Sequence, residues 1–416
     1  MSSREIYVFI ALRGENYLVG RLWCHYRKGR ESASFEYEES WLEHKERFAL
    51  EPALVLTAGP FHSDRNIFGS IGDSAPDRWG RVLMRRAESQ RARAAGETPR
   101  TLGEADFLLG VNDEARQGAL RYSDALDGEF FAPNYHRPIP PLVDLPRLLS
   151  ATERFLDEQE NADDLRVLLA PGSSLGGARP KASVRDNDGQ LAIAKFPSKD
   201  DENNIVVWEA VALALAKGAG LTLPSWRLLD ISGKSVLLIR RFDRAMKVRV
   251  PFLSAMSMLQ GKDNDSHSYL EIADALRQFG AESSEDMAQL WRRIVFSILI
   301  SNTDDHLRNH GFIYERYKGW RLSPAYDLNP TPVEVKPRIL TTTIDLDNGT
   351  ASLDLALSVV TDFRLSLKDG KAIIKEVGHA VSQWRNLAQA KNLSGGEIAR
   401  MASAFEHADA DFASRL

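Results

Sequence analysis

The sequence predicts an α+β protein, with a mixed N-terminal part followed by a mainly helical C-terminal part. Short strand-like runs bounded by turn residues occur before residue 60 and again between residues 182 and 241, as is typical of strands. Beyond about residue 265, helical patterns dominate. Between the two strand-rich regions, the proline-rich segment 133–141 is the best candidate for a domain boundary.

The individual elements follow from local patterns. In chain order we expect strands 7–12, 17–24 and 34–37, helices 77–95 and 142–161, strands 182–185 and 191–196, helix 206–217, strands 226–231 and 235–241, and helices 269–279, 284–300, 370–392 and 395–408. Residues 186–189, Asp-Asn-Asp-Gly, favour a hairpin turn. Gly218 and Gly220 are expected to end the helix before them, and Ser394 with Glu397 fits a capping box for the last helix.

Composition limits the class of protein. The chain has 416 residues, of which 43% are apolar and 27% charged, and its net charge is −5. This balance disfavours a generally basic nucleic-acid binder. With Cys24 as the single cysteine, no internal disulfide or multi-cysteine zinc site can form, and we expect a reducing, cytoplasmic location. The apolar run 6–12 is interpreted as a strand and not a signal, and no run approaches the roughly 20 apolar residues of a membrane span.

The strongest functional signal is the segment 301–310, Ser-Asn-Thr-Asp-Asp-His-Leu-Arg-Asn-His, directly after the apolar run 294–300. Two carboxylates, a histidine and an asparagine are poor core residues, so we expect this segment on a loop at a helix end. Protein kinases use an aspartate to orient the acceptor hydroxyl and an asparagine five residues later to bind Mg²⁺. Asp304 and Asn309 have this spacing and Asp305 does not, so Asp304 is the preferred catalytic residue.

Two other interpretations of this segment stay open. Aspartate and asparagine also satisfy loop backbone groups, so the segment could be a polar cap between two elements. Alternatively, Asp305, His306 and His310 could be ligands of a Mg²⁺- or Zn²⁺-dependent hydrolase, which would need further ligands from elsewhere. His306 could brace the catalytic loop by hydrogen bonds or pack beneath it, and the bracing role is favoured because a neutral imidazole both donates and accepts.

Three further residues match functional positions of protein kinases when their order along the chain is considered. Asp327 follows Asn309 by 18 residues, after strand-like runs at 311–314 and 320–322, where a kinase requires a second Mg²⁺ aspartate. Lys195 lies on an apolar strand and Glu209 on the next helix, which matches the lysine–glutamate pair that positions phosphates in kinases. Alone, each is more often a turn residue or an exposed edge residue.

The segment 173–181, Ser-Ser-Leu-Gly-Gly-Ala-Arg-Pro-Lys, precedes the first predicted hairpin. Its two glycines allow a backbone to approach phosphates, and exposed amides there can bind an anion. The segment is neither a Walker A loop nor the usual glycine loop of kinases, and a bare Gly-Gly is most often a turn.

Taken together, these motifs resemble the HipA family of bacterial type II toxin–antitoxin serine/threonine kinases. The matching segments are 73–80, 118–121, 174–181, 193–197, 241–244, 302–309 and 326–328. The resemblance implies a protein-kinase-like two-lobed fold with an extra N-terminal β-rich subdomain and an all-helical C-lobe. The implied domains are an N-terminal subdomain at 1–140, a nucleotide-binding small-lobe segment at 141–245 and a helical catalytic C-lobe at 246–416.

The resemblance also implies the site residues. ATP phosphates would contact Gly176, Gly177 and Ala178 with support from Lys195; adenine would bind backbone groups near Arg240 and Phe242; Asp304 would be the base, with Asn309 and Asp327 on Mg²⁺. Lys181 is also assigned to the nucleotide site, and Lys181 and Asp243 both match family positions whose exact roles the resemblance does not define. Arg240 occupies a position where some relatives carry an acidic residue. A contact of adenine with the backbone at this position is compatible with arginine, whereas a contact with an acidic side chain is not. Ser174, or its neighbour Ser173, aligns with the serine that HipA-type kinases phosphorylate on themselves.

Partners are implied in the same way: a helix-turn-helix antitoxin of the HipB type, operator DNA contacted mainly through that antitoxin, a translation component as protein substrate, and a role in persistence. The arginines of the helix at 77–95 could touch DNA phosphates, although such a run is more often a solvated face. They are Arg78, Arg81, Arg85, Arg86, Arg91 and Arg93. The alternative function is a catalytically silent, kinase-shaped corepressor, which the presence of all five kinase positions disfavours.

Overall fold

The computed structural model describes residues 2–27, 29–131, 139–172, 177–199, 201–246 and 248–416. The chain forms two compact units, one of residues 1–200 with 229–253 and one of residues 201–228 with 254–416. The mixed helix and strand content confirms the predicted α+β class. Most of the proline-rich segment 133–141, together with Ser173, Ser174 and Gly176, lies outside the described residues.

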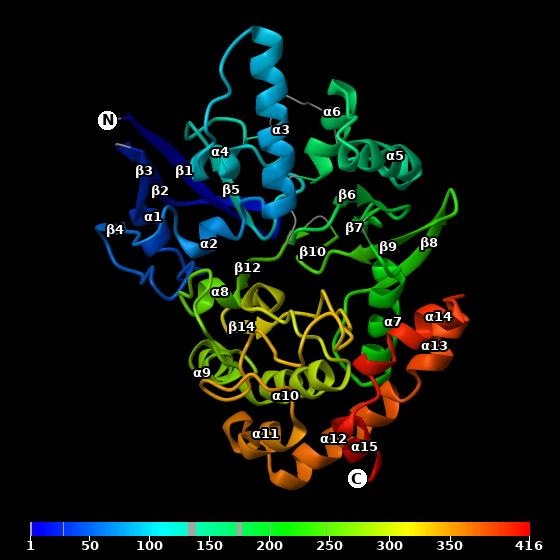
Figure 1. Ribbon diagram of the computed structural model, residues 1–416. Coiled ribbons are helices and arrows are strands. Elements are labelled where there is room, and N and C mark those ends of the chain that lie inside the picture. Colours follow the sequence, from blue (N-terminus) through cyan, green and yellow to red (C-terminus); the bar gives the residue numbers. More distant parts are fainter. Residues whose placement is uncertain (1, 28, 132–138, 173–176, 200, 247) are drawn as a thin grey trace. The chain divides into compact units, whose positions relative to one another are not determined.

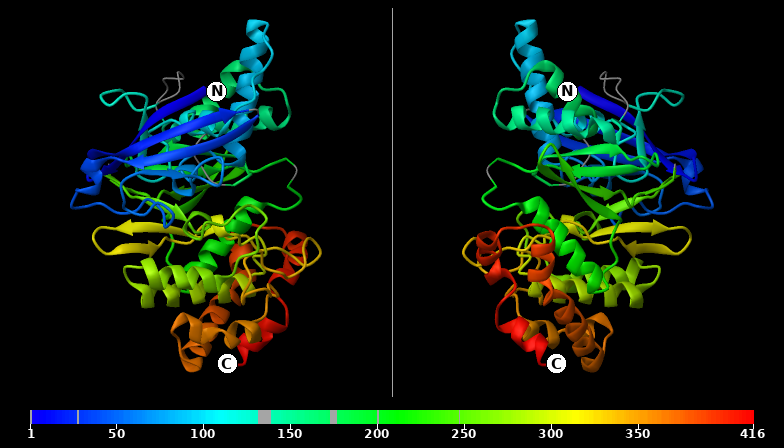
Figure 2. Two further views of the ribbon diagram at one scale, coloured as in Figure 1. Left: turned by 90° about the vertical axis from the view of Figure 1, so that its left-hand side faces the viewer. Right: turned by 90° about the vertical axis from the view of Figure 1, so that its right-hand side faces the viewer.

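The first unit begins with an antiparallel sheet of order β4-β3-β2-β1-β5 (Figures 1 and 2). Its strands are β1 Ser2–Leu12, β2 Glu15–Arg27, β3 Arg30–Tyr37, β4 Pro60–His62 and β5 Leu120–Ser123. Ile6, Val8 and Ile10 are buried at alternate positions of β1, as expected for a strand with one face on the core. Arg13 and Gly14 join β1 to β2 with positive φ angles of 53° and 88°, which the tight turn of a hairpin requires.

A second sheet of the first unit has the order β6-β7-β9-β8. Its strands are β6 Lys181–Arg185, β7 Leu191–Lys195, β8 Trp226–Ile231 and β9 Lys234–Arg240; two short strands, β10 Arg244–Ala245 and β11 Val248–Arg249, pair beside it, and β12 spans Phe252–Ser254. Both predicted hairpins are therefore present. Ala194 and Val236 of this sheet share one apolar core with Leu83, Leu148 and Leu168 of the neighbouring helices.

The helices of the first unit are α1 Glu39–Leu42, α2 Gly69–Gly72, α3 Arg78–Ala95, α4 Glu104–Leu109, α5 Leu145–Leu156 and α6 Ala162–Gly172. The prediction of one helix over 142–161 is wrong. A 3-10 turn at Leu142–Asp144 leads into α5, and Glu158 then takes a left-handed φ of 56° that ends the helical path. Asn161 starts α6, because its side chain accepts bonds from the backbone N–H groups of Asp163 and Asp164 at 2.9 Å.

The second unit is mainly helical. Its helices are α7 Ile205–Gly218, α8 Ala255–Met258, α9 Tyr269–Phe279, α10 Ser283–Leu299, α11 Leu353–Ser358, α12 Leu367–Val381, α13 Trp384–Ala390, α14 Gly395–Arg400 and α15 Ala408–Ser414. The hairpin of β13 Gly311–Glu315 and β14 Gly319–Leu322 is the exception to the expected all-helical part. Leu290, Ile294 and Ile298 of α10 are completely buried, and α12 packs against α10, α7 and α15.

Two long helices predicted near the C-terminus are each divided. The predicted helix 370–392 is α12 and α13, which separate at Ser382, because the new direction stacks Trp384 on Phe405 with ring centroids 4.6 Å apart. The predicted helix 395–408 is α14 followed by a 3-10 turn, and α15 begins only at Ala408. Ser394 caps α14 as predicted, but the predicted capping box is incomplete, because the Glu397 carboxylate accepts from the Asn204 N–H and the Trp208 indole instead. Among the described residues, no helix has the length and apolar character needed to cross a membrane.

Candidate functional site

The segment 301–310 leaves the C-terminal end of α10 as a loop, as the sequence predicts. Ser301 takes a left-handed φ of 52°, which turns the chain out of the helix. The hydroxyl of Ser301 donates to the carbonyl oxygen of Ala404 at 2.9 Å and accepts from Arg338 Nε at 3.0 Å. A 3-10 turn at Leu307–Asn309 closes the loop. The loop is thus held from two distant parts of the second unit.

Asp304 is the exposed residue at the centre of this loop. Its carbonyl oxygen accepts bonds from the backbone N–H of His306 at 2.9 Å and from Asn309 Nδ2 at 3.1 Å. Within the described ranges, its carboxylate makes no hydrogen bond or ion pair. The backbone of Asp304 is therefore fixed while its carboxylate faces solvent, as a group that receives a proton from a second molecule requires.

The segment around Asp327 is fastened to the same loop. After the β13–β14 hairpin, the Tyr326 hydroxyl donates to the carbonyl oxygen of Arg308 at 2.8 Å. The backbone N–H of Asn329 donates to Asn302 Oδ1 at 3.3 Å, and Asn329 Nδ2 donates to Asp327 Oδ1 at 3.3 Å. Asp327 itself has a left-handed φ of 59°, a conformation that costs free energy for a residue other than glycine and is concentrated at functional sites.

Asn309 and Asp327 present oxygen donors of the type that Mg²⁺ prefers. Since Asn309 uses Nδ2 for its bond to Asp304, its side-chain oxygen is left as an acceptor. Only one of the two residues is a carboxylate, so a cation between them would need oxygen atoms from a second molecule, such as nucleotide phosphates. The donor set therefore fits Mg²⁺ bound together with a nucleotide.

Asp305 turns away from solvent and is only 4% exposed. Tyr269 Oη donates to its Oδ2 at 2.5 Å, Ser297 Oγ donates to the same atom at 3.1 Å, and His310 Nε2 lies 3.1 Å from Oδ1. Burial raises the pKa of Asp305, but the His310 imidazole and these hydrogen bonds outweigh burial and hold the pKa below its ordinary value. Sequence reasoning missed this cluster, because its members come from α9, α10 and two places in the loop.

The cluster weakens the hydrolase interpretation. Asp305 and His310 lie against one another in the interior, and His306 contributes backbone bonds to Asp304 and Asn309. His306 Nδ1 is buried without a hydrogen-bond partner among the described residues. No group of three or more His, Cys, Asp or Glu side chains in the described part of the chain is arranged to hold a metal ion.

In the first unit, two lysines predicted to bind nucleotide lie opposite one another. Lys181 of β6 pairs with Lys195 of β7 in the antiparallel register, and Lys181 is 5% exposed. Gly177 has a φ of 93°, and a Cβ atom there would lie 2.6 Å from Lys181 Nζ and 3.9 Å from Asp77 Oδ2. The left-handed backbone at Gly177 favours glycine there, and the ammonium group of Lys181 lies close to it. Two cations on adjacent strands suit a polyanionic ligand.

The N-terminal motif 73–80 supports this end of β6. The indole of Trp79 donates to the carbonyl oxygen of Lys181 at 3.0 Å. The backbone N–H of Trp79 approaches the carbonyl oxygen of Gly177 at 3.4 Å. Trp79 also packs edge-on against Phe155 of α5. The motif thus joins α3 to the glycine-containing segment, which gives it a positioning role that the sequence did not reveal.

The other residues predicted to bind the nucleotide lie in different parts of the chain. Ala178 is exposed. The Arg240 side chain pairs with Asp188 of the neighbouring hairpin, and the Phe242 ring lies 6.1 Å from that of Phe252, centroid to centroid. Glu209 is buried in α7 of the second unit, 3% exposed, whereas Lys195 belongs to the first unit.

Asp243 is the centre of a buried ionic cluster in the first unit. Its carboxylate accepts bonds from Arg241 Nε at 2.8 Å, from Arg244 Nη1 at 2.8 Å and from the backbone N–H of Gly118 at 2.8 Å. Arg241 and Arg244 also donate to the carbonyl oxygen of Arg116, at 3.1 and 2.5 Å. Burial raises the pKa of Asp243, but the two guanidinium groups hold it well below its ordinary value. Asp243 therefore fastens the motif 241–244 to the motif 118–121.

Within the described part of the chain, three of the six arginines of α3 are paired with carboxylates. Arg81 makes two bonds to Glu104, at 2.6 and 2.7 Å. Arg91 makes two bonds to Glu88, each 2.9 Å long. Arg86 pairs with Glu158 and Glu160. These pairs favour a structural face over a DNA-binding one.

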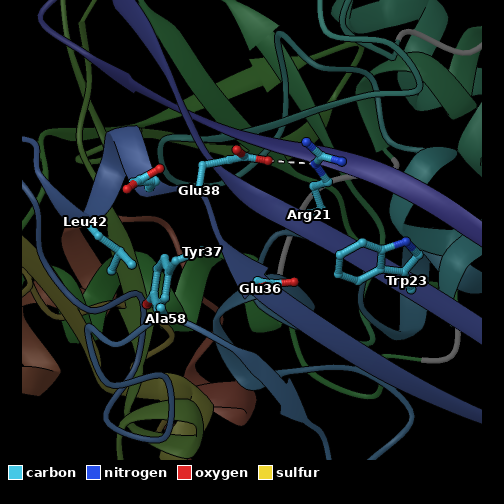
Figure 3. A pocket seen from close by; sticks show the side chains of 8 residues that line it. Arg21, Trp23, Glu36, Tyr37, Glu38, Leu42 and Ala58 are labelled. Atoms are coloured by element: carbon cyan, nitrogen blue, oxygen red, sulfur yellow. Dashed lines mark hydrogen bonds and ion pairs between the residues drawn. The ribbon is translucent and has the colours of Figure 1, made fainter.

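A cavity of about 450 Å³ lies on the N-terminal sheet (Figure 3). It is lined by Arg21, Trp23, Glu36, Tyr37, Glu38, Glu39, Leu42 and Ala58. Across it, Arg21 Nε donates to Glu38 Oε1 at 2.6 Å. None of these lining residues belongs to the predicted site.

Comparison with known proteins gives a family match. Residues 173–384, just over half of the chain, match the family described as the HipA-like C-terminal domain. Two similar proteins come from Sinorhizobium fredii. "Putative kinase Y4dM" is 31% identical over 187 residues, which cover 38% of this chain and 45% of that protein. "Putative kinase Y4mE" is 26% identical over 328 residues, which cover 71% of this chain and 72% of that protein.

Among solved structures, the chain is similar to HipA from Shewanella oneidensis MR-1, in a complex of that toxin–antitoxin system with HipB and its operator DNA. The TM-score is 0.67, the sequence identity is 13%, and the likeness covers 98% of this chain and 97% of the other. At this identity the likeness concerns the fold alone. The fold described above is therefore that of a HipA protein along nearly its whole length.

Proposed function

Because this chain belongs to the HipA-like family, we propose that it is an ATP- and Mg²⁺-dependent serine/threonine protein kinase that acts as the toxin of a toxin–antitoxin pair. The observation that carries the proposal is the loop after α10. Exposed Asp304 is followed there by Asn309, and the segment of Asp327 is bonded to the same loop. This is the set of side chains that phosphoryl transfer to a hydroxyl requires.

Asp304 is proposed as the residue that orients the acceptor hydroxyl and takes its proton. Its carboxylate faces solvent, so a serine side chain of another protein can reach it. Its backbone is held by His306 and Asn309. A fixed base matters because phosphoryl transfer gains most of its rate from positioning and charge stabilisation.

Asn309 and Asp327 would hold Mg²⁺, which supplies positive charge to the β- and γ-phosphates when it is bound. Gly177 and Ala178, with Gly176 outside the described residues, would bind phosphates through their backbone. Lys181 and Lys195, opposite one another on β6 and β7, would add positive charge there. Adenine would bind backbone groups near Arg240 and Phe242.

The partners are part of the proposal. The similar HipA of Shewanella oneidensis was solved with HipB and operator DNA, so we assign to this chain a helix-turn-helix antitoxin that carries the contact with DNA. A translation component in the cytoplasm is the proposed substrate, together with the chain's own Ser174 or Ser173.

The test compares phosphoryl transfer and nucleotide binding in the same preparations. Transfer from γ-labelled ATP should fall about 100-fold or more in Asp304→Asn, while ATP affinity stays near that of the wild type. Asp354→Asn, an exposed aspartate in the first turn of α11, is the matched control and should transfer phosphate normally. Wild-type transfer in Asp304→Asn would refute the assignment. A wild-type chain that binds the antitoxin but transfers no phosphate would be the silent corepressor instead.

A further inference from the structure

A buried carboxylate stands directly beside the exposed one in the loop after α10. Asp305 bonds to Tyr269 Oη at 2.5 Å and to Ser297 Oγ at 3.1 Å, and its Oδ1 lies 3.1 Å from His310 Nε2. Tyr269 begins α9, Ser297 lies in the last turns of α10, and His310 precedes β13. One side chain therefore joins the loop to α9 and α10 and also contacts His310 at the loop's own end.

The main chain on each side of Asp304 is bonded as well. The carbonyl oxygen of Asp305 accepts from Thr342 twice, at 2.6 Å from its hydroxyl and 3.2 Å from its N–H. The carbonyl oxygen of Thr303 accepts from Thr341 twice, at 2.9 Å from the hydroxyl and 3.2 Å from the N–H. The residues before and after Asp304 are thus both held by residues about 40 positions later in the chain: Thr303 by Thr341, and Asp305 by Thr342.

A buried anion is a costly way to anchor a loop, because its charge must be desolvated and matched with donors. An apolar side chain at position 305 would pack in the same interior at lower cost. What the carboxylate adds is direction, since hydroxyl donors from α9 and α10, together with the nearby His310 imidazole, define where its oxygens lie. Because Asp304 is joined to Asp305 by a single peptide bond, fixing Asp305 also limits the orientation of Asp304.

We propose that Asp305 is a positioning residue, which with Tyr269 sets the direction of the Asp304 carboxylate toward the acceptor hydroxyl. The inference rests on the proposed kinase function and assigns Asp305 no contact with the substrate. A base displaced by about 1 Å loses on the order of 100-fold in rate. Release of the anchor should therefore reduce turnover much more than nucleotide binding.

Three variants test the anchor. Asp305→Asn keeps the size and removes the charge, and its kcat should fall about 30- to 100-fold with ATP affinity changed less than about threefold. Tyr269→Phe removes one hydroxyl and should lower kcat about three- to tenfold, which provides a milder variant if Asp305→Asn folds poorly. Asp286→Asn is the matched control. Asp286 is 2% exposed and bonds Arg321 Nε at 2.9 Å and the Leu322 N–H at 3.1 Å, away from the loop.

A double-variant cycle separates positioning from general damage. If Asp305 acts through Asp304, Asp305→Asn should cost almost nothing further in the background of Asp304→Asn, because residues that act as a unit are not additive. Equal costs in both backgrounds would overturn the proposal. So would parallel losses of activity and stability in Asp305→Asn and Asp286→Asn.

Amide hydrogen exchange gives a readout that does not depend on catalysis. Asp305→Asn and Tyr269→Phe should raise exchange in peptides covering 301–310, while peptides of α12 keep wild-type protection. Unchanged exchange in that loop would overturn the anchor even if the kinase function holds. If the wild type transfers no phosphate, the proposed function fails, and loop exchange still decides whether Asp305 orders residue 304.

Discussion

Asn309 donates a hydrogen bond of 3.1 Å from its Nδ2 to the carbonyl oxygen of Asp304. The same side chain therefore braces the proposed base and would offer its remaining oxygen to the proposed Mg²⁺. Asp327 has no such double role toward Asp304. The two proposed Mg²⁺ ligands can consequently be told apart by their variants.

Asp327→Ala should weaken Mg²⁺-dependent ATP binding by about tenfold or more, because a carboxylate ligand is lost. Asn309→Asp keeps an oxygen ligand for the cation but removes the Nδ2 donor to the carbonyl oxygen of Asp304. The Mg²⁺ affinity of this variant should therefore persist while its kcat falls. Titration calorimetry with and without Mg²⁺, beside turnover, measures both. Equal ATP affinity of Asp327→Ala and wild type in Mg²⁺ would contradict the ligand assignment.

Autophosphorylation should silence the enzyme. A phosphoserine at Ser174 adds about −1.5 to −2 charges close in sequence to Arg179 and to Lys181, which is proposed to add positive charge beside the nucleotide phosphates. Incubation with Mg²⁺-ATP followed by mass spectrometry should find phosphate on Ser174 or Ser173 in wild type and not in Asp304→Asn. Ser174→Asp should bind ATP poorly, and Ser174→Ala should stay active for longer. Unmodified serines, or wild-type ATP binding by Ser174→Asp, would disprove the switch.

The Asp243 cluster should dominate the stability of the first unit. Asp243→Ala leaves Arg241 and Arg244 buried without their counter-charge, and loss of one partner of such a cluster costs about 3–5 kcal/mol. Asp188→Ala removes the exposed partner of Arg240 and should cost about 1 kcal/mol or less. Urea unfolding of both variants measures the difference. Similar losses in the two variants would show that the buried cluster adds little.

Stability should fall in mildly acidic solution because of His407. His407 caps the start of α15, because its Nδ1 accepts a hydrogen bond from the Ala410 N–H in the first turn of that helix. Burial lowers the pKa of His407 to about 4. The folded state thus keeps this ring neutral, whereas the unfolded chain protonates it below about pH 6.5. Its contribution is complete above pH 6.5 and is lost as the pH falls toward 4.

His407→Asn preserves a capping side chain without titration. Between pH 7 and pH 5 the wild type should lose about 2 kcal/mol more unfolding free energy than this variant. Chemical unfolding at the two pH values measures the loss. Identical pH dependence in both proteins would show that the ring is not held neutral.

Binding to duplex DNA should be weak and sensitive to salt when the chain is alone. The net charge is −5, and several arginines of α3 are already paired with carboxylates. Complex formation with the antitoxin should raise affinity for operator DNA strongly. Fluorescence anisotropy at about 50 and 200 mM salt tests this. Tight, sequence-specific binding by the isolated chain would contradict it.

The sequence predicts elements best where their ends are marked locally. Helix α9 was predicted with its observed bounds, and Ser268 with Glu271 forms a complete capping box at its start. The break at Ser382 was missed, because it depends on the packing of Trp384 against Phe405, 21 positions away. In α14, Glu397 bonds to Asn204 and the Trp208 indole, partners that no local pattern reveals.

The same limit applies to the site. The sequence predicted Asp304 and Asn309 on one loop and Asp327 after a later hairpin, and hydrogen bonds join the segment of Asp327 to that loop. The roles of Asp243 and Asp305 could not be predicted, because each involves a distant partner: Gly118 lies 125 positions from Asp243, and Tyr269 lies 36 positions from Asp305. Spacing within a motif identifies residues that act on a ligand, whereas residues that hold a motif in place are identified by contacts between distant segments.

The division of the chain has a consequence for its synthesis. The first unit needs residues 229–253 in addition to residues 1–200, and these supply β9 and the Arg241–Asp243–Arg244 cluster. A ribosome that has released only the first 200 residues has therefore not yet released a central strand of the second sheet or the Arg241–Asp243–Arg244 cluster that bonds to Gly118. The nascent unit must wait until about residue 253 has left the exit tunnel, by which time α7 of the other unit has already emerged.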